Sequence, residues 1–196
     1  MLSDFIKNLV SVFISEIRFV IMKLIHRKYF KFKGIQRFSP YTEVSIDSNA
    51  FIEFGNRVRA HTGTRIRARK GAKIIIGDDV AFNYNCILTA YDEINIGSGC
   101  EIGPGVLFYD HDHDFHGRSI KEKKFRKAPI KIGKNVWIGA NSIILRGTTI
   151  GDNCVIGAGT IVCGNKEYPK NSLIKNNIEI IYNRYKKDDN NENNVF

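Results

Sequence analysis

The sequence contains few cysteines, and none of them stands in a C-x-x-C pair. Four cysteines in 196 residues, without metal-ligand spacing, argue against a zinc site or a disulfide framework. We expect all four to be small buried residues in a reducing compartment. They are Cys86, Cys100, Cys154 and Cys163.

The sequence also lacks an apolar run long enough to cross a membrane. Glu16, Arg18 and Lys23 interrupt the longest apolar stretch, so a span of about 20 apolar residues is excluded. No small-residue cleavage site follows that stretch, which argues against a secretory signal peptide. We therefore expect a cytoplasmic protein, and peripheral contact with the inner face of the plasma membrane stays open.

Residues 1–33 are predicted to form an amphipathic helical segment, because apolar residues recur on one face at helical spacing. Basic residues gather at the end of this segment, interleaved with aromatic ones. Two interpretations remain open: the helix packs on the rest of the protein or on a partner subunit, or it lies on an anionic membrane surface. The apolar positions are Ile6, Leu9, Val10, Phe13, Ile14, Ile17, Val20, Ile21 and Leu24, and the basic ones are His26, Arg27, Lys28, Lys31 and Lys33.

Acidic residues are scarce relative to basic ones, with 20 Asp and Glu against 30 Lys and Arg and a net charge of +10. The basic excess lies mainly in residues 1–33 and 118–131, which predicts an anionic partner such as a nucleotide phosphate, an acidic glycan or a membrane surface. Nucleic acid is the least favoured partner, because no nucleic-acid-binding motif accompanies the charge. Residues 186–196 are rich in Asp, Asn and Glu, and are predicted to be a disordered tail.

An aliphatic or aromatic residue recurs at every sixth position over much of residues 46–162. A period of six is neither helical nor a simple strand alternation, but it fits a triangular coil in which three short strands complete one turn. The repeated side chains would point inward and stack from coil to coil, while Gly and Asn suit the corners. The repeat positions are Ile46, Ile52 and Val58; Ile76, Phe82, Leu88 and Ile94; Ile96 and Ile102; and Ile132, Ile138, Ile144, Ile150, Ile156 and Val162.

The repeat predicts one β-helix domain over residues 34–185, with two interruptions. The register slips by two residues between Ile94 and Ile96, which we interpret as a local bulge. The larger break covers residues 109–129, and a polar insertion of that length within a compact repeat is expected to carry function.

Three of the five histidines lie in this insertion among aspartates: His111, His113 and His116. Such a cluster suits metal ligation. It equally suits general base catalysis, in which a neutral imidazole takes a proton from an attacking hydroxyl. A neighbouring acid or backbone carbonyl would then fix the tautomer of the base.

The hexapeptide repeats, the histidine-bearing loop and the run from Ile132 to Val162 together resemble the hexapeptide-repeat acyltransferases. The similarity is greatest to the sugar O-acetyltransferases, which include galactoside, maltose, and capsule or lipopolysaccharide acetyltransferases. The resemblance covers roughly residues 45–175 and implies a left-handed parallel β-helix. It also implies a homotrimer with active sites between subunits. Acetyl-CoA would be the donor cosubstrate, with no metal required.

Carried over residue by residue, the resemblance implies that His111 is the catalytic base, with His113 as the fallback. It implies that Asn83, the first residue of an Asn-Tyr-Asn segment, contacts the acceptor, and that Asp92 does so as well. The implied mechanism is direct transfer. The histidine deprotonates an acceptor hydroxyl, which attacks the thioester carbonyl without a covalent acyl-enzyme.

The same resemblance implies a set of CoA-binding residues. Trp137 would border the CoA channel, and the backbone at Gly103, Ala140 and Ala158 would line the pantetheine arm. The sequence departs from the family after the last repeat, where Cys-Gly-Asn-Lys replaces the usual Thr-Lys-Asp. Lys166 would therefore approach the CoA phosphates from a shifted position.

The favoured function is acetylation of a sugar hydroxyl in surface polysaccharide biosynthesis. An antibiotic O-acetyltransferase shares the repeats and the loop histidine and stays an alternative. A carbonic-anhydrase-like metal hydratase is less favoured, because the spacing of His111 and His116 fits but no third histidine lies at residues 70–80. A non-catalytic scaffold is the remaining class.

Overall fold

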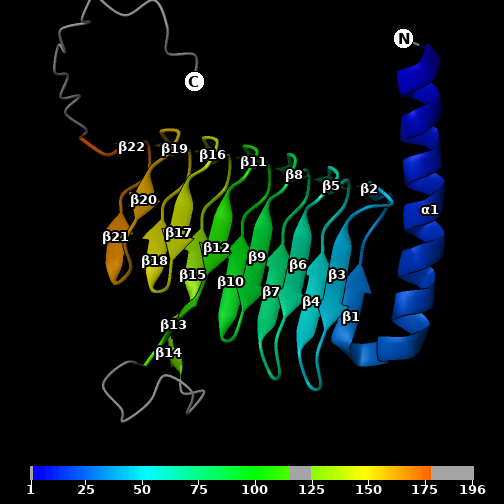
Figure 1. Cartoon of the computed structure of the whole chain (residues 1–196), viewed down its shortest axis with the longest axis horizontal. Helices are drawn as coiled ribbons and strands as arrows, with labels where there is room; N and C mark the ends of the chain where they lie inside the picture. Colours follow the sequence, from blue (N-terminus) through cyan, green and yellow to red (C-terminus); the bar gives the residue numbers. More distant parts are fainter. Residues whose placement is uncertain (1, 115–124, 178–196) are drawn as a thin grey trace, which may run out of the picture.

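The chain winds into a parallel β-helix with one α-helix across its N-terminal end (Figure 1). The computed structural model describes residues 2–114 and 125–177. Successive strands enter three sheets in turn, so the chain completes one triangular coil with every three strands. We refer to these as the first, second and third sheets.

The strand bounds follow this cycle. The first sheet contains β1 (Phe30–Phe32), β4 (Phe51–Phe54), β7 (Lys73–Ile76), β10 (Glu93–Ile96), β15 (Ile130–Ile132), β18 (Thr148–Ile150) and β21 (Lys166–Tyr168). The second contains β2 (Arg37–Phe38), β5 (Arg59–Ala60), β8 (Ala81–Phe82), β11 (Glu101–Ile102), β16 (Trp137–Ile138), β19 (Val155–Ile156) and β22 (Leu173–Ile174). The third contains β3 (Glu43–Ile46), β6 (Arg65–Ala68), β9 (Ile87–Ala90), β12 (Leu107–Tyr109), β17 (Ile143–Leu145) and β20 (Ile161–Val162).

Inward-facing aliphatic side chains stack along each sheet and form the core. Ile74, Ile94 and Ile130 make one such column, in register across β7, β10 and β15, and all three are fully buried. Because neighbouring coils lie about 4.8 Å apart, each inward residue is covered by its equivalents above and below. The predicted parallel β-helix of hexapeptide coils is confirmed.

The β-helix begins before residue 34, because β1 pairs with β4 from Phe30 onward. The interior of the first coils is filled by the buried residues Phe30, Phe38 and Phe54, and the rings of Phe30 and Phe38 each contact that of Phe54. These aromatic positions do not continue the aliphatic hexads, so the repeat spacing misses them. The helix correspondingly ends at His26 and not at residue 33.

The predicted bulge between Ile94 and Ile96 is wrong. Both residues lie on β10, and both are fully buried. Because side chains alternate along a strand, a four-residue strand presents two inward residues. The pairing of β10 with β7 and β15 therefore continues without interruption.

Asparagine and glycine occupy the corners, as the repeat predicts. Asn135, Asn153 and Asn171 stack at one corner with φ of 54°, 58° and 61°, a left-handed conformation that asparagine tolerates better than most residues. Their side-chain amides are hydrogen-bonded in a ladder, with distances of 3.3 and 3.1 Å.

Helix α1 (Leu2–His26) closes the N-terminal end of the core, followed by the 3-10 turn η1 (Arg27–Tyr29). Phe19 inserts from α1 into the first coils and stacks on Phe54 at a centroid distance of 5.4 Å. Ser15 Oγ accepts the backbone N–H of Phe38 at 2.8 Å, and Arg18 donates to the backbone carbonyl of Thr42 at 3.0 Å. The interpretation that the helix packs on the rest of the protein is confirmed.

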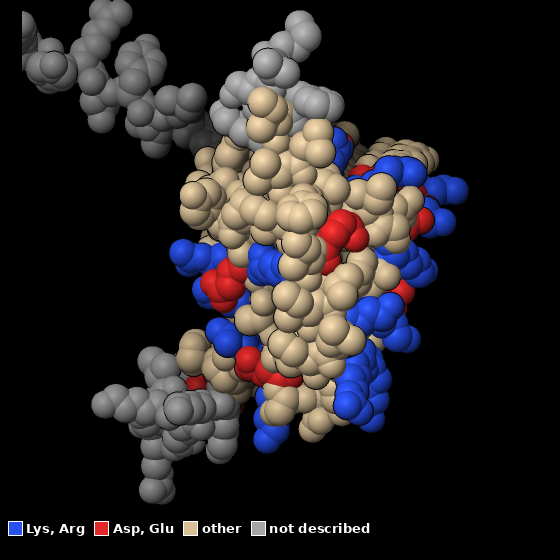
Figure 2. All heavy atoms as spheres, turned by 90° about the vertical axis from the view of Figure 1, so that its right-hand side faces the viewer, with Lys and Arg blue, Asp and Glu red and all other residues tan. Residues whose placement is uncertain are grey.

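The opposite face of α1 is exposed and apolar. Among the residues whose side chains the structure describes, ten large apolar ones share it, from 36% exposed for Ile14 to 72% for Leu24. Figure 2 shows this end of the molecule as a largely uncharged surface bordered by Lys and Arg side chains. In the described part of the chain, no helix has the length and apolar character needed to span a bilayer. The exposed positions are Ile6, Leu9, Val10, Phe13, Ile14, Ile17, Val20, Ile21, Leu24 and Ile25.

Three cysteines are buried, as predicted, but Cys163 is exposed. Burial raises the pKa of the Cys86 and Cys100 thiols to about 11, so neither is a reactive thiolate at neutral pH. Cys163 follows β20 at a corner, where its side chain leaves the core. The prediction of burial is wrong for this residue.

Candidate functional site

The long break in the repeat forms an antiparallel hairpin that leaves the coil after β12. Its strands are β13 (His111–His113) and β14 (Phe125–Lys127). An ion pair between Asp112 and Arg146 ties β13 to the residue after β17. At the base of the hairpin, the backbone N–H of Ala128 donates to the carbonyl of Asp110 at 3.0 Å. The hairpin is therefore closed at its base and tied to the next coil.

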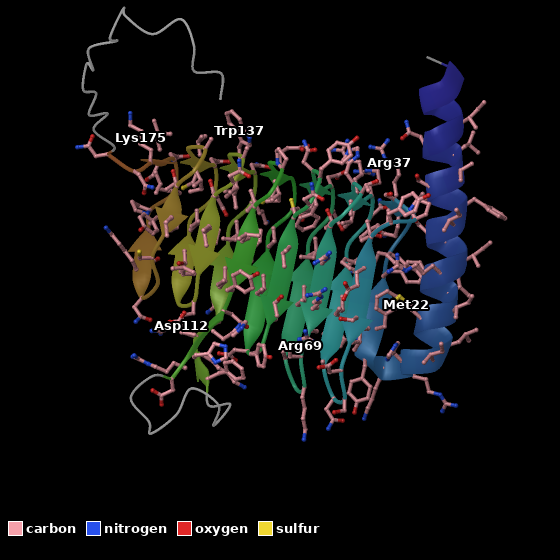
Figure 3. The ribbon with its side chains drawn as sticks, viewed as in Figure 1. Met22, Arg37, Arg69, Asp112, Trp137 and Lys175 are labelled. Carbon is pink, nitrogen blue, oxygen red and sulfur yellow. The ribbon has the colours of Figure 1, made fainter. Side chains whose placement is uncertain are left out.

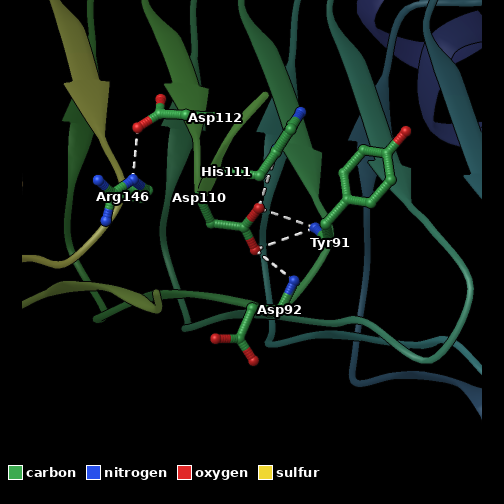
Figure 4. Close-up of polar contacts among 6 residues, drawn as sticks. All are labelled: Tyr91, Asp92, Asp110, His111, Asp112 and Arg146. Carbon is green, nitrogen blue, oxygen red and sulfur yellow. Dashed lines mark hydrogen bonds and ion pairs between the residues drawn. The ribbon is translucent and has the colours of Figure 1, made fainter. Parts of the chain in front are cut away.

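The side chain of Asp110, the residue before β13, is fully buried, and each of its carboxylate oxygens has a hydrogen-bond partner. Its oxygens accept the backbone N–H groups of Tyr91, at 2.8 and 3.0 Å, and of Asp92, at 2.7 Å. Oδ1 also lies 3.1 Å from Nδ1 of His111 (Figure 4). Burial of a charged group is tolerable only with such partners.

His111 is oriented by this carboxylate. Both oxygens of Asp110 already accept backbone N–H groups, so this carboxylate favours the tautomer of His111 that donates from Nδ1. In that tautomer, Nε2 is the ring nitrogen that accepts a proton from another molecule. The ring is 13% exposed, so it is held in place and still reachable.

Three aromatic rings enclose His111. The Tyr91 ring lies 4.2 Å from it between centroids, Phe125 lies 5.4 Å away and Tyr109 lies 5.8 Å away, the last two edge-on. These contacts come from three segments: the corner after β9, β14 of the hairpin and the end of β12. The imidazole is thus fixed by packing as well as by its hydrogen bond.

The structure places the other candidates near His111 differently. His113 shares β13 with His111, is exposed, and contacts the Phe125 ring at 4.8 Å. Asp92 is joined to the site through its backbone N–H, and its side chain is exposed. His116 and the basic residues 118–124 lie outside the described residues.

Asn83 lies at the corner between β8 and β9, whereas His111 lies near the corner at the other end of the third-sheet strands. It precedes β9, whereas Tyr91 follows that strand. Four residues of β9 at about 3.3 Å each separate the two by roughly 13 Å. Within one chain, Asn83 and His111 are therefore not brought together.

A small hollow of about 90 Å³ adjoins Asn83 and is lined by Arg59 and His61, among other residues. Burial lowers the pKa of His61, and the nearby charges of Arg37 and Arg59 lower it further. This second histidine is therefore neutral at neutral pH.

The small residues implicated in CoA binding form one track. Gly103, Ala140 and Ala158 occupy the same corner in successive coils. A Cβ added to Gly103 would lie 2.7 Å from the backbone nitrogen of Ala140, and one added to Gly139 would lie 2.5 Å from that of Ala158. A track without large side chains leaves room for a thin ligand along the coil surface.

Trp137 lies on β16, in register between Glu101 and Val155, and is 58% exposed. Figure 3 shows it on the upper edge of the molecule, whereas Asp112 of the hairpin lies on the lower edge. Lys166 is on β21 in the first sheet, with its ammonium 5.2 Å from the Tyr168 ring centroid. Lys166 therefore does not share the corner of the small-residue track.

Sequence reasoning missed Asp110 and Tyr91. The Asp-His dipeptide signals an acid beside the base, but does not distinguish Asp110 from Asp112. Tyr91 contacts His111 because the chain returns to the same corner one coil, or 20 residues, later. Thr89 and Tyr109 are paired across these coils, and Tyr91 and His111 each lie two residues further on. Counting one coil back from the histidine would have found it.

In residues 2–114 and 125–177, no group of three or more His, Cys, Asp or Glu side chains is arranged to hold a metal ion. His116, on which the hydratase alternative depends, lies outside these ranges.

Comparison with known proteins supports the same fold. A family model described as "Hexapeptide repeat of succinyl-transferase" matches residues 129–163. The chain is 40% identical over 101 residues to galactoside O-acetyltransferase of Escherichia coli K12, covering 52% of this chain and 49% of that protein. It is 28% identical over 167 residues to the E. coli K12 protein named putative lipopolysaccharide biosynthesis O-acetyl transferase WbbJ, covering 81% and 82%. The chain therefore spans about half the length of the first of these relatives.

Among solved structures, the chain is similar to AntD, an N-acyltransferase from Bacillus cereus in complex with dTDP and 3-hydroxybutyryl-CoA. The TM-score is 0.63 at 20% identity, covering 79% of this chain and 82% of the other. At this level of identity, the similarity concerns the fold.

Proposed function

We propose that the chain, which resembles the hexapeptide-repeat acyltransferases, transfers an acetyl group from acetyl-CoA to a hydroxyl of a sugar. The observation that carries the proposal is His111, whose Nδ1 is held by the buried Asp110 at the one long break in the repeat. The names of the relatives, a galactoside and a lipopolysaccharide O-acetyltransferase, favour a sugar acceptor. The second name favours a role in surface polysaccharide biosynthesis.

The proposed reaction is a direct transfer. His111 takes the hydroxyl proton on Nε2 as the hydroxyl oxygen attacks the thioester carbonyl. The C–S bond then breaks, the acetyl ester remains on the sugar, and the proton returns from His111 to the departing CoA sulfur. Asp110 holds the ring in the competent tautomer and stabilises the imidazolium formed during the transfer.

Gly103, Ala140 and Ala158 are the residues proposed to line the pantetheine arm, with Trp137 beside the channel and Lys166 toward the phosphates. The small side chains at this corner support the assignment, because a thin ligand can approach the coil surface closely there. No metal is proposed.

The separation of Asn83 from His111 supports a site built from two subunits. In the proposed homotrimer, Asn83 of one chain and His111 of the next would face the same acceptor. Asp92, one residue after Tyr91, is proposed to contact the acceptor from the His111 side.

We expect the purified full-length chain to release free thiol from acetyl-CoA in the presence of a subset of sugars. The panel contains free sugars, nucleotide-linked and lipid-linked saccharides, and hydroxyl-bearing antibiotics, with mass spectrometry of the product. If only an antibiotic is acetylated, the protein is an antibiotic O-acetyltransferase and the polysaccharide role is wrong. Absence of transfer to every acceptor, by a protein that binds no CoA, would contradict the proposal.

We also propose that the exposed face of α1 rests on an anionic bilayer surface. The outer face carries ten large apolar side chains, and Lys23, Arg27, Lys28 and Lys31 are exposed at its end. Glu16 is turned inward, where it accepts the backbone N–H of Gln36 at 2.8 Å. Apolar burial and basic charge together favour anionic lipid.

The chain should co-sediment with vesicles containing phosphatidylglycerol, and less with phosphatidylcholine alone. Replacing both Leu24 and Ile25 with Gln removes two side chains that are 72% and 69% exposed, so the fold is retained and binding should fall at least tenfold, since each buried aliphatic side chain contributes about 1.5–3 kcal/mol. The matched control is Leu173→Gln, 65% exposed at the far end of the β-helix. Equal sedimentation of the double variant and the control would refute membrane docking.

A further inference from the structure

One corner of the β-helix carries polar and aromatic side chains in successive coils, leading toward His111. Asp47, Arg69 and Tyr91 each follow a third-sheet strand, after β3, β6 and β9. These strands pair in register, with Ile46 opposite Ala68 and Ala68 opposite Ala90. Because coils are about 4.8 Å apart, Arg69 lies roughly 10 Å from the level of His111. Figure 3 shows Arg69 and Asp112 of the hairpin along the same edge.

An open hollow of about 410 Å³ lies along this corner. Its lining contains three basic residues, Arg69, Lys70 and Lys127, and one acidic residue, Asp47. Tyr91 and Phe125 complete the wall. The surface of the hollow therefore carries a net positive charge, which concentrates anions in a recess.

Arg69 is not fully paired by the protein. Its contact with Asp47 is long, at 3.8 Å, and its buried Nε has no hydrogen-bond partner among the described residues. Arg67, two residues earlier, shows the alternative: its Nε and a terminal nitrogen bind both oxygens of Glu43 at 2.7 Å. The Arg69 side chain is 35% exposed and lines the hollow, so its terminal N–H groups can donate to an anion there.

Tyr91 borders both the hollow and the catalytic candidate. Tyr91 lines the hollow and also contacts the His111 ring at 4.2 Å. Lys127 lies opposite His111 in the hairpin, and its ammonium is 5.8 Å from the Tyr91 ring centroid. An acceptor whose hydroxyl meets His111 can thus extend past Tyr91 toward Arg69.

We propose that this hollow binds an anionic phosphate group of the acceptor, and that the acceptor is a sugar carrying a phosphate or diphosphate at its anomeric carbon. The inference rests on the proposed function. One sugar ring and its phosphate would span the two coil spacings, about 10 Å, between His111 and Arg69. Arginine offers several N–H donors to phosphate oxygens, while Lys70 and Lys127 add charge. A nucleotide-linked and a lipid-linked sugar share this chemistry.

The first test is binding, without acetyl transfer. Titration calorimetry at fixed ionic strength should detect inorganic pyrophosphate binding to the full-length chain. Arg69→Gln and Lys127→Gln should each weaken binding at least tenfold. Arg57→Gln, which removes an exposed arginine paired with Asp79, is the matched control and should bind like the unmodified protein. Equal binding by Arg69→Gln and Arg57→Gln, or no binding at all, would overturn the inference.

The second test uses the sugar that is acetylated best in the acceptor panel, as its methyl glycoside, its nucleotide diphosphate and its lipid diphosphate. The charged acceptors should have a KM at least tenfold below that of the glycoside. Arg69→Gln should remove this advantage and leave the KM for acetyl-CoA unchanged. The better of the two charged acceptors identifies the source of the phosphate. If pyrophosphate binds through Arg69 but no sugar is acetylated, the acetyltransferase function fails and the anion site stands. If the glycoside is acetylated equally well, the inference fails and the function stands.

Discussion

Replacing His111 with Ala lowers kcat for acetyl transfer by about 10³-fold, because a positioned general base contributes 10²- to 10⁴-fold. KM for acetyl-CoA changes little, since the residues proposed to hold CoA lie on other corners and sheets. The measurement is thiol release at saturating acetyl-CoA, with circular dichroism to check that the fold is retained.

His113→Ala is the matched control for this change. His113 lies on the same strand, but it is exposed and contacts only the Phe125 ring among the aromatic residues around His111. Its loss should reduce kcat less than about fivefold, well below the contribution of a general base. If His113→Ala is the more damaging variant, the base is His113 and the orienting role of Asp110 loses its basis.

Asp110→Asn has the second-largest expected effect, a fall in kcat of about 10²-fold with KM nearly unchanged. Asp110 accepts hydrogen bonds on two oxygens, but asparagine has only one acceptor oxygen. The NH2 group of the asparagine would therefore face either a backbone N–H or Nδ1 of His111. The histidine then loses its fixed tautomer. The unsatisfied buried donor also lowers stability by about 1–3 kcal/mol, which thermal unfolding measures.

A loss of stability alone would not establish a positioning role for Asp110. Asp112→Asn in the same hairpin breaks the ion pair with Arg146, and that acid is 46% exposed. Exposed pairs contribute about 0–1 kcal/mol, so this control should change Tm slightly and kcat less than threefold. Asp110→Asn with a lowered Tm but an unchanged kcat would show that the carboxylate serves only to hold the hairpin.

The sequence predicts the β-helix well where one aliphatic residue per hexad fills the interior. Ile132, Ile138 and Ile144 each face the core, and the triangular cross-section follows from their spacing. The pattern fails in the first coils, because Phe30, Phe38 and Phe19 of α1 share one interior volume. Residues that pack together from a helix and from the coils do not recur at a fixed spacing along the chain.

The site was only partly predictable for a related reason. The break in the repeat locates His111, because this histidine lies in the segment where the hexads stop. The partners of His111 come from stacking between coils: Tyr91 lies 20 residues earlier and is adjacent only because each coil returns to the same corner. Cys163 shows the opposite failure, because its hydrophobic character does not reveal that it follows β20 at a corner and is exposed.

The role of His111 as the base of an acetyl transfer can be tested directly. The most direct measurement follows CoA release and O-acetyl sugar formation together, in the unmodified full-length chain and in His111→Ala. We expect equal amounts of both products from the unmodified chain and a rate about 10³-fold lower from the variant. Equal rates from the two proteins would contradict a catalytic role for His111, as would CoA release without acetylated sugar.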